Sequence, residues 1–213
     1  GMPADTLLGK RSTIVDFETA AGRATLEHLL ARSDVVILGY RPGSLHRFGL
    51  APELLAERYP GLTIVSLAAW GHTGPWAERR GFDSVVQAAS GIAMRESTDD
   101  GAPGALPCQL LDHGTGYLAA AAALDGIAEQ MTEGGTRVRR LSLARTAAWV
   151  LGLPAIASTP AGVSRPREDL SSWALELGGG QRAVSPPGTL DGVPLSWPGP
   201  SSGYGTSRPV WNA

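Results

Sequence analysis

The sequence contains a single cysteine, Cys108, among its 213 residues. One thiol cannot form an internal disulfide bond or provide the cysteine ligands of a structural zinc site. The four histidines, His28, His46, His72 and His113, do not follow the spacing of metal ligands either. We therefore expect no metal centre. The scarcity of cysteine fits the reducing cytoplasm, where we expect the protein to be located.

Neither sign of charge dominates, because the chain has 18 basic and 20 acidic residues. Electrostatic binding to nucleic acid or to an anionic membrane needs a basic surface, so we expect neither partner. No apolar run reaches the roughly 18 residues of a membrane span, and the first twelve residues lack the apolar stretch of a secretory signal. At 43% hydrophobic and 18% charged residues, the composition is that of a globular domain.

Three common motifs are also missing. The sequence has no G-x-S-x-G elbow between an apolar strand and a helix, no glycine-rich phosphate loop of the nucleoside triphosphatases and no G-x-G-x-x-G after a strand. The nucleophile elbow of the serine hydrolases and the two common nucleotide-binding turns are therefore not indicated.

Short β-branched runs alternate with helix-like segments in the first third of the chain. The runs lie at residues 12–16, 34–38 and 62–67, and the helical patterns at residues 20–32 and 53–59. Compact apolar runs of this length are typical of parallel strands that are covered on both faces. The alternation predicts right-handed strand–helix–strand crossovers and hence an α/β fold, a Rossmann-like open parallel sheet with flanking helices.

Further elements follow a loop rich in Gly, Pro and Trp. We expect helices at residues 82–94, at the alanine-rich residues 117–131 and at residues 144–151, with a strand at residues 136–143.

From residue 154 the composition shifts to Gly, Pro and Ser. Residues 173–177 suit a helical turn or a strand, and we expect residues 178–213 to be irregular extended chain. We therefore predict two parts: a core of residues 1–153 and a C-terminal segment, residues 154–213, that packs on the core or on a partner.

Four short motifs occur in a fixed order: RPG at residues 41–43, GHTGP at 71–75, FDSVVQAASG at 82–91 and LLDHGTG at 110–116. Together they resemble the family III CoA-transferases, the group that includes formyl-CoA transferase, carnitine CoA-transferase and α-methylacyl-CoA racemase. The resemblance extends over residues 8–153. It implies that the chain uses coenzyme A, as an acyl-CoA substrate, together with a carboxylic acid.

Asp112 matches the catalytic aspartate of that family. The resemblance implies that its carboxylate attacks the acyl-CoA thioester and forms an aspartyl anhydride, then an aspartyl-CoA thioester. The N–H groups of Gly114, Thr115 and Gly116 would then stabilise the oxyanions, and His113 is placed to tune the pKa of Asp112. The alternative is structural, since an aspartate directly before a helix commonly caps it.

The resemblance also implies residues that contact coenzyme A. Gly39 stands where the family usually has Asn, which removes one polar contact. Arginine suits the CoA phosphates because its planar guanidinium can bind them through two hydrogen bonds. The implied contacts are Val15, Asp16, Phe17, Glu18, Gly39, Tyr40, Arg41, Arg47, Arg80, Gly81, Phe82 and Asp83.

Two departures from the family pattern leave alternatives open. The chain lacks the family's first strand–helix–strand segment and its smaller domain, so we expect a fragment or one half of a tandem or dimeric protein. Its partner would be a second copy or another CoA-transferase half. The alternatives to a transferase are a non-catalytic half and an acyl-CoA racemase. The glycine run at residues 178–181 resembles an active-site loop of some members, although a flexible linker explains it as well.

Overall fold

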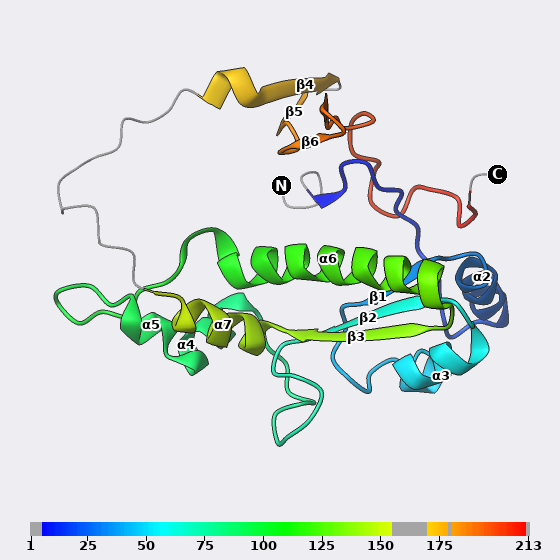
Figure 1. Ribbon diagram of the computed structural model, residues 1–213, viewed down its shortest axis with the longest axis horizontal. Coiled ribbons are helices and arrows are strands. Elements are labelled where there is room, and N and C mark those ends of the chain that lie inside the picture. The colour runs from blue at the N-terminus through cyan, green and yellow to red at the C-terminus, as the bar shows by residue number, and fades with distance from the viewer. Residues whose placement is uncertain (1–5, 155–169, 179, 212–213) are drawn as a thin grey trace. The chain divides into compact units, whose positions relative to one another are not determined.

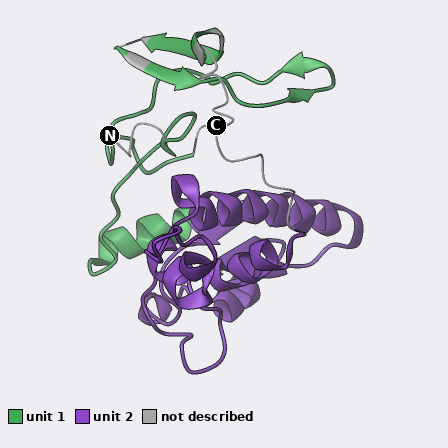
Figure 2. Ribbon diagram, turned by 90° about the vertical axis from the view of Figure 1, so that its left-hand side faces the viewer, with its two compact units in different colours: residues 1–29, 156–213 green, residues 30–155 purple. Residues whose placement is uncertain are grey.

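The structure is a computed structural model that describes residues 6–154, 170–178 and 180–211. It divides into two compact units: residues 30–155 form one, and residues 1–29 with 156–213 form the other (Figure 2). These units differ from the predicted parts, residues 1–153 and 154–213, and that division stays a prediction. Among the described helices, none has the length and apolar character needed to cross a bilayer.

A three-stranded parallel sheet lies at the centre of unit 2, residues 30–155 (Figure 1). Its strands are β1 (Val35–Leu38), β2 (Thr63–Ala68) and β3 (Arg137–Ser142), in that order, with β2 between the other two. Five of the six residues of β2 are buried, as expected of a strand covered on both faces. The predicted open α/β sheet is confirmed.

Helices connect these strands. After β1 come a short 3-10 helix, η1 (His46–Phe48), and α3 (Pro52–Arg58), which leads to β2. Pro52 begins α3, at a position where its missing N–H has no helical partner to lose. The longest helix, α6 (Leu110–Glu133), leads to β3 and packs on β2 and β3. It begins well before the residues predicted for it.

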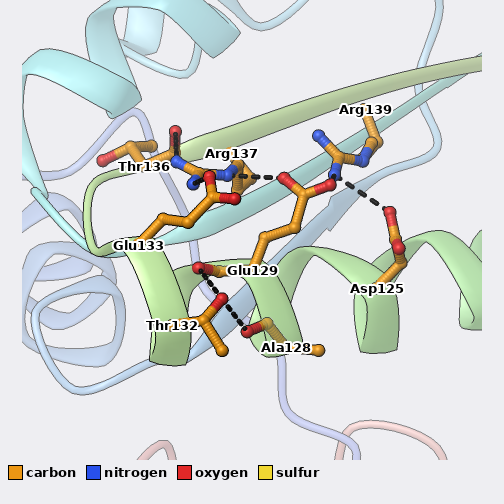
Figure 3. Close-up of polar contacts among 8 residues, drawn as sticks. All are labelled: Asp125, Ala128, Glu129, Thr132, Glu133, Thr136, Arg137 and Arg139. Carbon is orange, nitrogen blue, oxygen red and sulfur yellow. Dashed lines mark hydrogen bonds and ion pairs between the residues drawn. The ribbon is translucent and has the colours of Figure 1, made fainter.

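The inner face of α6 is made of small residues at helical spacing. Its buried positions are Leu111, Thr115, Ala119, Ala123 and Gly126. Four ion pairs then join the C-terminal half of α6 to β3 (Figure 3). Arg137 binds Glu129 and Glu133, and Arg139 binds Asp125 and Glu129, all at 2.7–2.9 Å.

A second group of helices packs beyond the carboxyl end of the sheet. These are α4 (Asp83–Ser90), α5 (Ile92–Arg95) and α7 (Leu143–Gly152), and η2 (Pro107–Gln109) precedes α6. Ser142 caps α7 by accepting a 3.2 Å hydrogen bond from the Arg145 amide. The buried core here fixes the start of α6 and consists of Val86, Ile92, Leu111, Leu143 and Ala147.

Unit 1, residues 1–29 with 156–213, contains most of α2 (Ala20–Leu30) and the C-terminal elements. These are η3 (Leu170–Trp173) and two antiparallel hairpins, β4 (Ala174–Gly178) with β5 (Gln181–Val184) and β6 (Thr189–Leu190) with β7 (Val193–Pro194).

Two predictions for unit 1 are wrong. Residues 12–16 do not form a strand, because Thr13 makes only an isolated bridge with Thr206. The C-terminal segment is not wholly irregular, because it contains the two hairpins. The N-terminal and C-terminal segments contact each other within this unit, where Thr13 pairs with Thr206 and the Trp211 indole donates a 3.0 Å hydrogen bond to the Leu29 carbonyl.

Candidate active site

A cavity of about 390 Å³ opens at the carboxyl end of the parallel sheet. Its walls come from five places: residues 39–41 after β1, residues 67–69 at the end of β2, residues 79–82 before α4, Asp112 of α6 and Leu143 of α7. Open parallel sheets commonly bind ligands at this edge, where the loops after neighbouring strands meet. The fold therefore brings together residues that lie more than 100 positions apart in the sequence.

Asp112 lies in the first turn of α6 and forms part of the cavity wall. Partial burial, which disfavours the charged carboxylate, and the nearby negative charge of Asp83 raise the pKa of Asp112. His113 acts in the opposite direction, as expected from its place in the sequence, and lowers that pKa. Asp112 is therefore a more basic carboxylate than a free aspartate.

Asp112 does not cap its helix. The capping position of α6 is Gln109, which makes no side-chain cap hydrogen bond. Asp83 provides the cap instead: its Oδ2 atom accepts hydrogen bonds from the Leu111 amide at 2.8 Å and the Asp112 amide at 3.0 Å. The structural alternative for Asp112 is thus contradicted, and its carboxylate is left for other chemistry.

Asp83 is almost completely buried, at 1% exposure. Its Oδ1 atom accepts a hydrogen bond from the side-chain amide of Gln87, and the Gln87 Oε1 atom accepts one from the Leu106 amide at 2.8 Å. Asp83 does not line the cavity, although the sequence resemblance placed it among the coenzyme A contacts. Its part in holding α6 has no local sequence signal, because its partners lie 28 and 29 residues away.

Six of the predicted coenzyme A contacts lie on the cavity wall with Asp112: Gly39, Tyr40, Arg41, Arg80, Gly81 and Phe82. Tyr40 and Phe82 are 69% and 71% exposed, so most of each side chain is open to solvent. Arg47 is not part of this wall; its guanidinium lies over the Phe48 ring, 4.5 Å from the centroid.

The remaining predicted contacts, Val15, Asp16, Phe17 and Glu18, belong to the other compact unit. Within it, the Glu18 amide donates a 2.9 Å hydrogen bond to Asp16, and Arg23 donates to the carbonyls of Phe17 and Glu18. Their role in binding coenzyme A stays a prediction. The glycine run at residues 178–181 includes Gly179, which lies outside the described residues.

The predicted oxyanion donors do not fit their role. Gly114, Thr115 and Gly116 lie inside α6, where a helix commits each N–H to the carbonyl four residues earlier. Thr115 is fully buried, and its hydroxyl forms a 2.7 Å hydrogen bond with that of Thr146 on α7. Thr115 therefore fastens two helices beneath the site.

The loop before α4 contains features that the sequence did not reveal. Arg79 lines the cavity, and its guanidinium lies 5.0 Å from the centre of the Trp76 ring. Trp76 meets Trp70 edge to face at 4.8 Å, and the Trp70 indole donates a 3.1 Å hydrogen bond to the Arg80 carbonyl. The two tryptophans therefore brace the loop and do not line the cavity.

No metal centre is evident in the part of the chain that the structure describes. Among the described residues, no group of three or more His, Cys, Asp or Glu side chains is placed to bind a metal ion.

The fold and the cavity define an α/β protein with a ligand site at the carboxyl edge of its sheet and an aspartate in the wall of that site. A sequence model described as CoA-transferase family III matches residues 6–175. The chain belongs to this family.

Curated relatives agree with that assignment. The chain is 33% identical over 135 residues to the probable fatty acyl-CoA transferase Rv3272 of Mycobacterium tuberculosis, a match that covers 63% of this chain and 34% of that protein. It is 30% identical over 129 residues to the succinyl-CoA–D-citramalate CoA-transferase of Chloroflexus aurantiacus, covering 61% and 32%. The chain thus spans about a third of the length of these relatives.

Solved structures show the same fold. A CAIB/BAIF family protein from Brucella suis superposes with a TM-score of 0.66 and 32% identity, over 70% of this chain and 39% of that one. A crystal structure of Rv3272 superposes with a TM-score of 0.64 and 32% identity, over 68% and 41%.

Proposed function

We propose that the chain carries the nucleophile of an acyl-CoA:carboxylate CoA-transferase and that Asp112 is that nucleophile. The observation that supports this most is the position of Asp112. Its carboxylate lies on the wall of the cavity, makes no cap hydrogen bond to its own helix and has a raised pKa. A more basic carboxylate is a better nucleophile toward a thioester carbonyl.

The reaction would proceed in four exchanges. Asp112 attacks the thioester carbonyl and the carbon–sulfur bond breaks. CoA departs as a thiolate, and an aspartyl-acyl anhydride remains on the protein. The thiolate then attacks the aspartyl carbon and releases the first acid, which leaves an aspartyl-CoA thioester. The acceptor carboxylate attacks that thioester, the carbon–sulfur bond breaks to release CoA thiolate, and a second anhydride forms. The thiolate finally attacks the acceptor's acyl carbon, which gives the new acyl-CoA and frees Asp112.

The cavity wall supports a role in binding acyl-CoA. Arg41, Arg79 and Arg80 bring three positive charges to it, and guanidinium groups suit phosphates. The exposed rings of Tyr40 and Phe82 offer apolar surface for the non-phosphate part of the ligand. Relatives are named for fatty acyl-CoA, succinyl-CoA, formyl-CoA and acetyl-CoA transfer, so we assign the substrate only as an acyl-CoA and a carboxylic acid.

The cavity favours a transferase over a racemase. Inversion at the α-carbon needs one group that removes a proton and another that returns it on the opposite face. Among the described residues that line the cavity, Asp112 is the one carboxylate and there is no histidine. A single nucleophile suffices for the transferase.

We also propose that the chain acts with a second polypeptide, either a copy of itself or another CoA-transferase half. Within the described residues, β1 and β3 each pair only with β2 and leave both edges of the sheet open, and such edges are ready sites for pairing. Analytical ultracentrifugation tests this proposal. It would be contradicted if the chain sediments as a monomer at every concentration and remains a monomer when a candidate partner chain is added. A cytoplasmic location stays a prediction.

Trapping tests the nucleophile directly. The protein is incubated with an acyl-CoA, treated with hydroxylamine and digested, and mass spectrometry is expected to find a hydroxamate at Asp112. Asp112→Asn should give none, whereas Asp99→Asn, which removes an exposed carboxylate elsewhere, should leave the adduct intact. Deuterium exchange at the α-carbon without an adduct would instead indicate a racemase. Failure to bind coenzyme A in calorimetry, together with tight binding to another chain, would indicate a non-catalytic half.

A further inference from the structure

We propose that Asp83 is a positioning residue for Asp112: its buried carboxylate fixes the first turn of α6 against α4 and places a second negative charge near the Asp112 carboxylate. This inference rests on the proposed function, because it assigns Asp83 a part in making Asp112 a nucleophile. It replaces the expected contact between Asp83 and coenzyme A.

One oxygen of Asp83 accepts hydrogen bonds from two backbone amides at the start of α6, one of which is the amide of Asp112. A helix leaves its first N–H groups without partners inside the helix. At the start of α6 the Asp83 Oδ2 atom accepts two of them, those of Leu111 and Asp112 itself. The backbone of the proposed nucleophile is therefore tied directly to α4, and its position in the cavity wall depends on that bond.

Gln87, one turn later on α4, completes the arrangement. It donates to the second oxygen of Asp83 and accepts the Leu106 amide hydrogen. The segment from Leu106 to Asp112 is thus held at both ends by a single pair of side chains on α4.

The segment between those two attachments is strained. Cys108 and Gln109 have φ values of 61° and 49°, a left-handed conformation that non-glycine residues rarely adopt. Such conformations persist where the surroundings hold them in place. The Asp83–Gln87 pair is what holds this one, because it fastens the residues on either side.

Ionisable groups lie around Asp112 on three sides, and the fourth side is apolar. Asp83 of α4 raises the pKa of Asp112, and His113 of α6 lowers it. The cavity wall adds the ionisable side chains of Tyr40, Arg41, Arg79 and Arg80, whereas α7 contributes the apolar Leu143. Asp83 is therefore the one carboxylate found to act on Asp112 among the described residues, and removing its charge must lower the pKa of Asp112.

A side-chain swap separates the charge of Asp83 from its hydrogen bonds. In Asp83→Asn alone, the new amide meets the Gln87 amide donor to donor, so the first turn of α6 loosens. We expect adduct formation to slow about 100-fold, the magnitude that a displacement of roughly 1 Å can produce. In the double variant D83N/Q87E, the introduced asparagine accepts the two α6 amides and donates to the introduced glutamate, whose other oxygen accepts from Leu106.

The decisive measurement is the rate of adduct formation as a function of pH. Its acid limb, where the rate falls as Asp112 becomes protonated, reports the pKa of Asp112. The double variant should regain the melting temperature of the wild type and most of its rate. Its acid limb should move to lower pH, because the negative charge has moved along α4 from residue 83 to residue 87. A purely structural Asp83 would leave the acid limb of the double variant unchanged, and that result would overturn the proposal. Asp125→Asn removes an exposed carboxylate from the same helix as Asp112 and should leave the limb in place.

Two measurements need no turnover and so distinguish this proposal from the proposed function. Carbon-13 NMR titration should show a lower pKa for the Asp112 carboxyl in D83N/Q87E than in the wild type. Hydrogen exchange at the Leu111 and Asp112 amides should accelerate in Asp83→Asn and recover in the double variant. If the wild type forms no adduct but these shifts occur, the proposed function fails and the positioning of Asp112 stands. If neither measurement changes, the positioning of Asp112 by Asp83 is refuted.

Discussion

Gly126 allows α6 to approach the sheet more closely than any other residue would. A Cβ atom at this position would lie 2.6 Å from the Cγ2 atom and 3.2 Å from the Oγ1 atom of Thr63, whereas ordinary contacts begin at 3.4 Å. Thr63 is 1% exposed and belongs to the central strand, so it has no free space to move into. Gly126→Ala therefore forces the helix and the strand apart by about 1 Å.

Two opposing terms set the size of the effect. Overpacking a buried contact costs about 1–3 kcal/mol, and we expect the upper end because both backbones are held in regular structure. Replacing glycine by alanine inside a helix stabilises the folded protein by about 1 kcal/mol, because alanine has the higher helix propensity. The net expectation for Gly126→Ala is a loss of about 2 kcal/mol in the free energy of unfolding.

Gly116 provides a matched control on the same helix, because a Cβ atom there meets nothing within 4 Å. Gly116→Ala should gain about 1 kcal/mol, so the two substitutions should have opposite signs in urea unfolding followed by circular dichroism. Thr63→Ser removes the methyl group that clashes. The double variant G126A/T63S should therefore recover at least about 1 kcal/mol as a coupling energy. A Gly126→Ala protein as stable as the wild type would refute this account of the helix–sheet contact.

Two further predictions follow from the loop before α4 and from the ion pairs on α6. A Cβ atom on Gly81 would lie 2.6 Å from the Ala69 Cβ and 2.9 Å from the Trp70 indole nitrogen, so Gly81→Ala should displace the cavity wall and weaken coenzyme A binding in calorimetry about tenfold, or 1.4 kcal/mol. Gly152→Ala, where a Cβ atom has open space, is the control, and equal affinities in the two variants would contradict the prediction. Hydrogen bonds from Arg139 and Arg137 lower the pKa of Glu129 in the folded protein. The stability that comes from these ion pairs is therefore present above about pH 4.5, the ordinary pKa of Glu. It is lost as the pH falls through the lowered pKa of Glu129. The melting temperature of Glu129→Gln should therefore approach that of the wild type on acidification, and a constant difference between them would argue against the ion pairs.

The strands of the sheet could be predicted because their signal is local. Residues 34–38 and 62–67 are short apolar runs bounded by turn residues, and burial on both faces leaves few other structures for them. The run at residues 12–16 has the same appearance, yet among the described residues its only β pairing is the isolated bridge between Thr13 and Thr206. A strand needs a partner, and the local sequence does not say whether one is present.

The start of α6 could not be predicted, for a physical reason. Gly114 and Gly116 are poor helix formers, and nothing between Leu106 and Leu110 resembles a helix cap. The cap comes from Asp83, in another helix, so no local pattern contains it. The same reasoning explains why the sequence allows Asp112 as a helix cap: the residue type and position are right, but a different carboxylate holds the amides.

One hairpin has a local signal in the sequence. Asp191 and Gly192, with φ values of 50° and 80°, form the two-residue turn between β6 and β7. The sequence Asp-Gly between apolar residues is a strong indicator of such a turn. Here it lies in a segment otherwise rich in Gly, Pro and Ser, whose composition favours irregular chain.

The capping of α6 from outside also bears on the chemistry. An aspartate that caps its own helix is stabilised as an anion by the amides and the helix dipole, which makes it a weaker base. Here those amides donate to Asp83, so Asp112 has the position of a first-turn carboxylate without hydrogen bonds from the amides of its own helix. Asp83, deprived of water, is the group that needs the amides, and its charge works against that of Asp112. A helix start that would ordinarily weaken a nucleophile is thereby compatible with an aspartate that attacks a thioester.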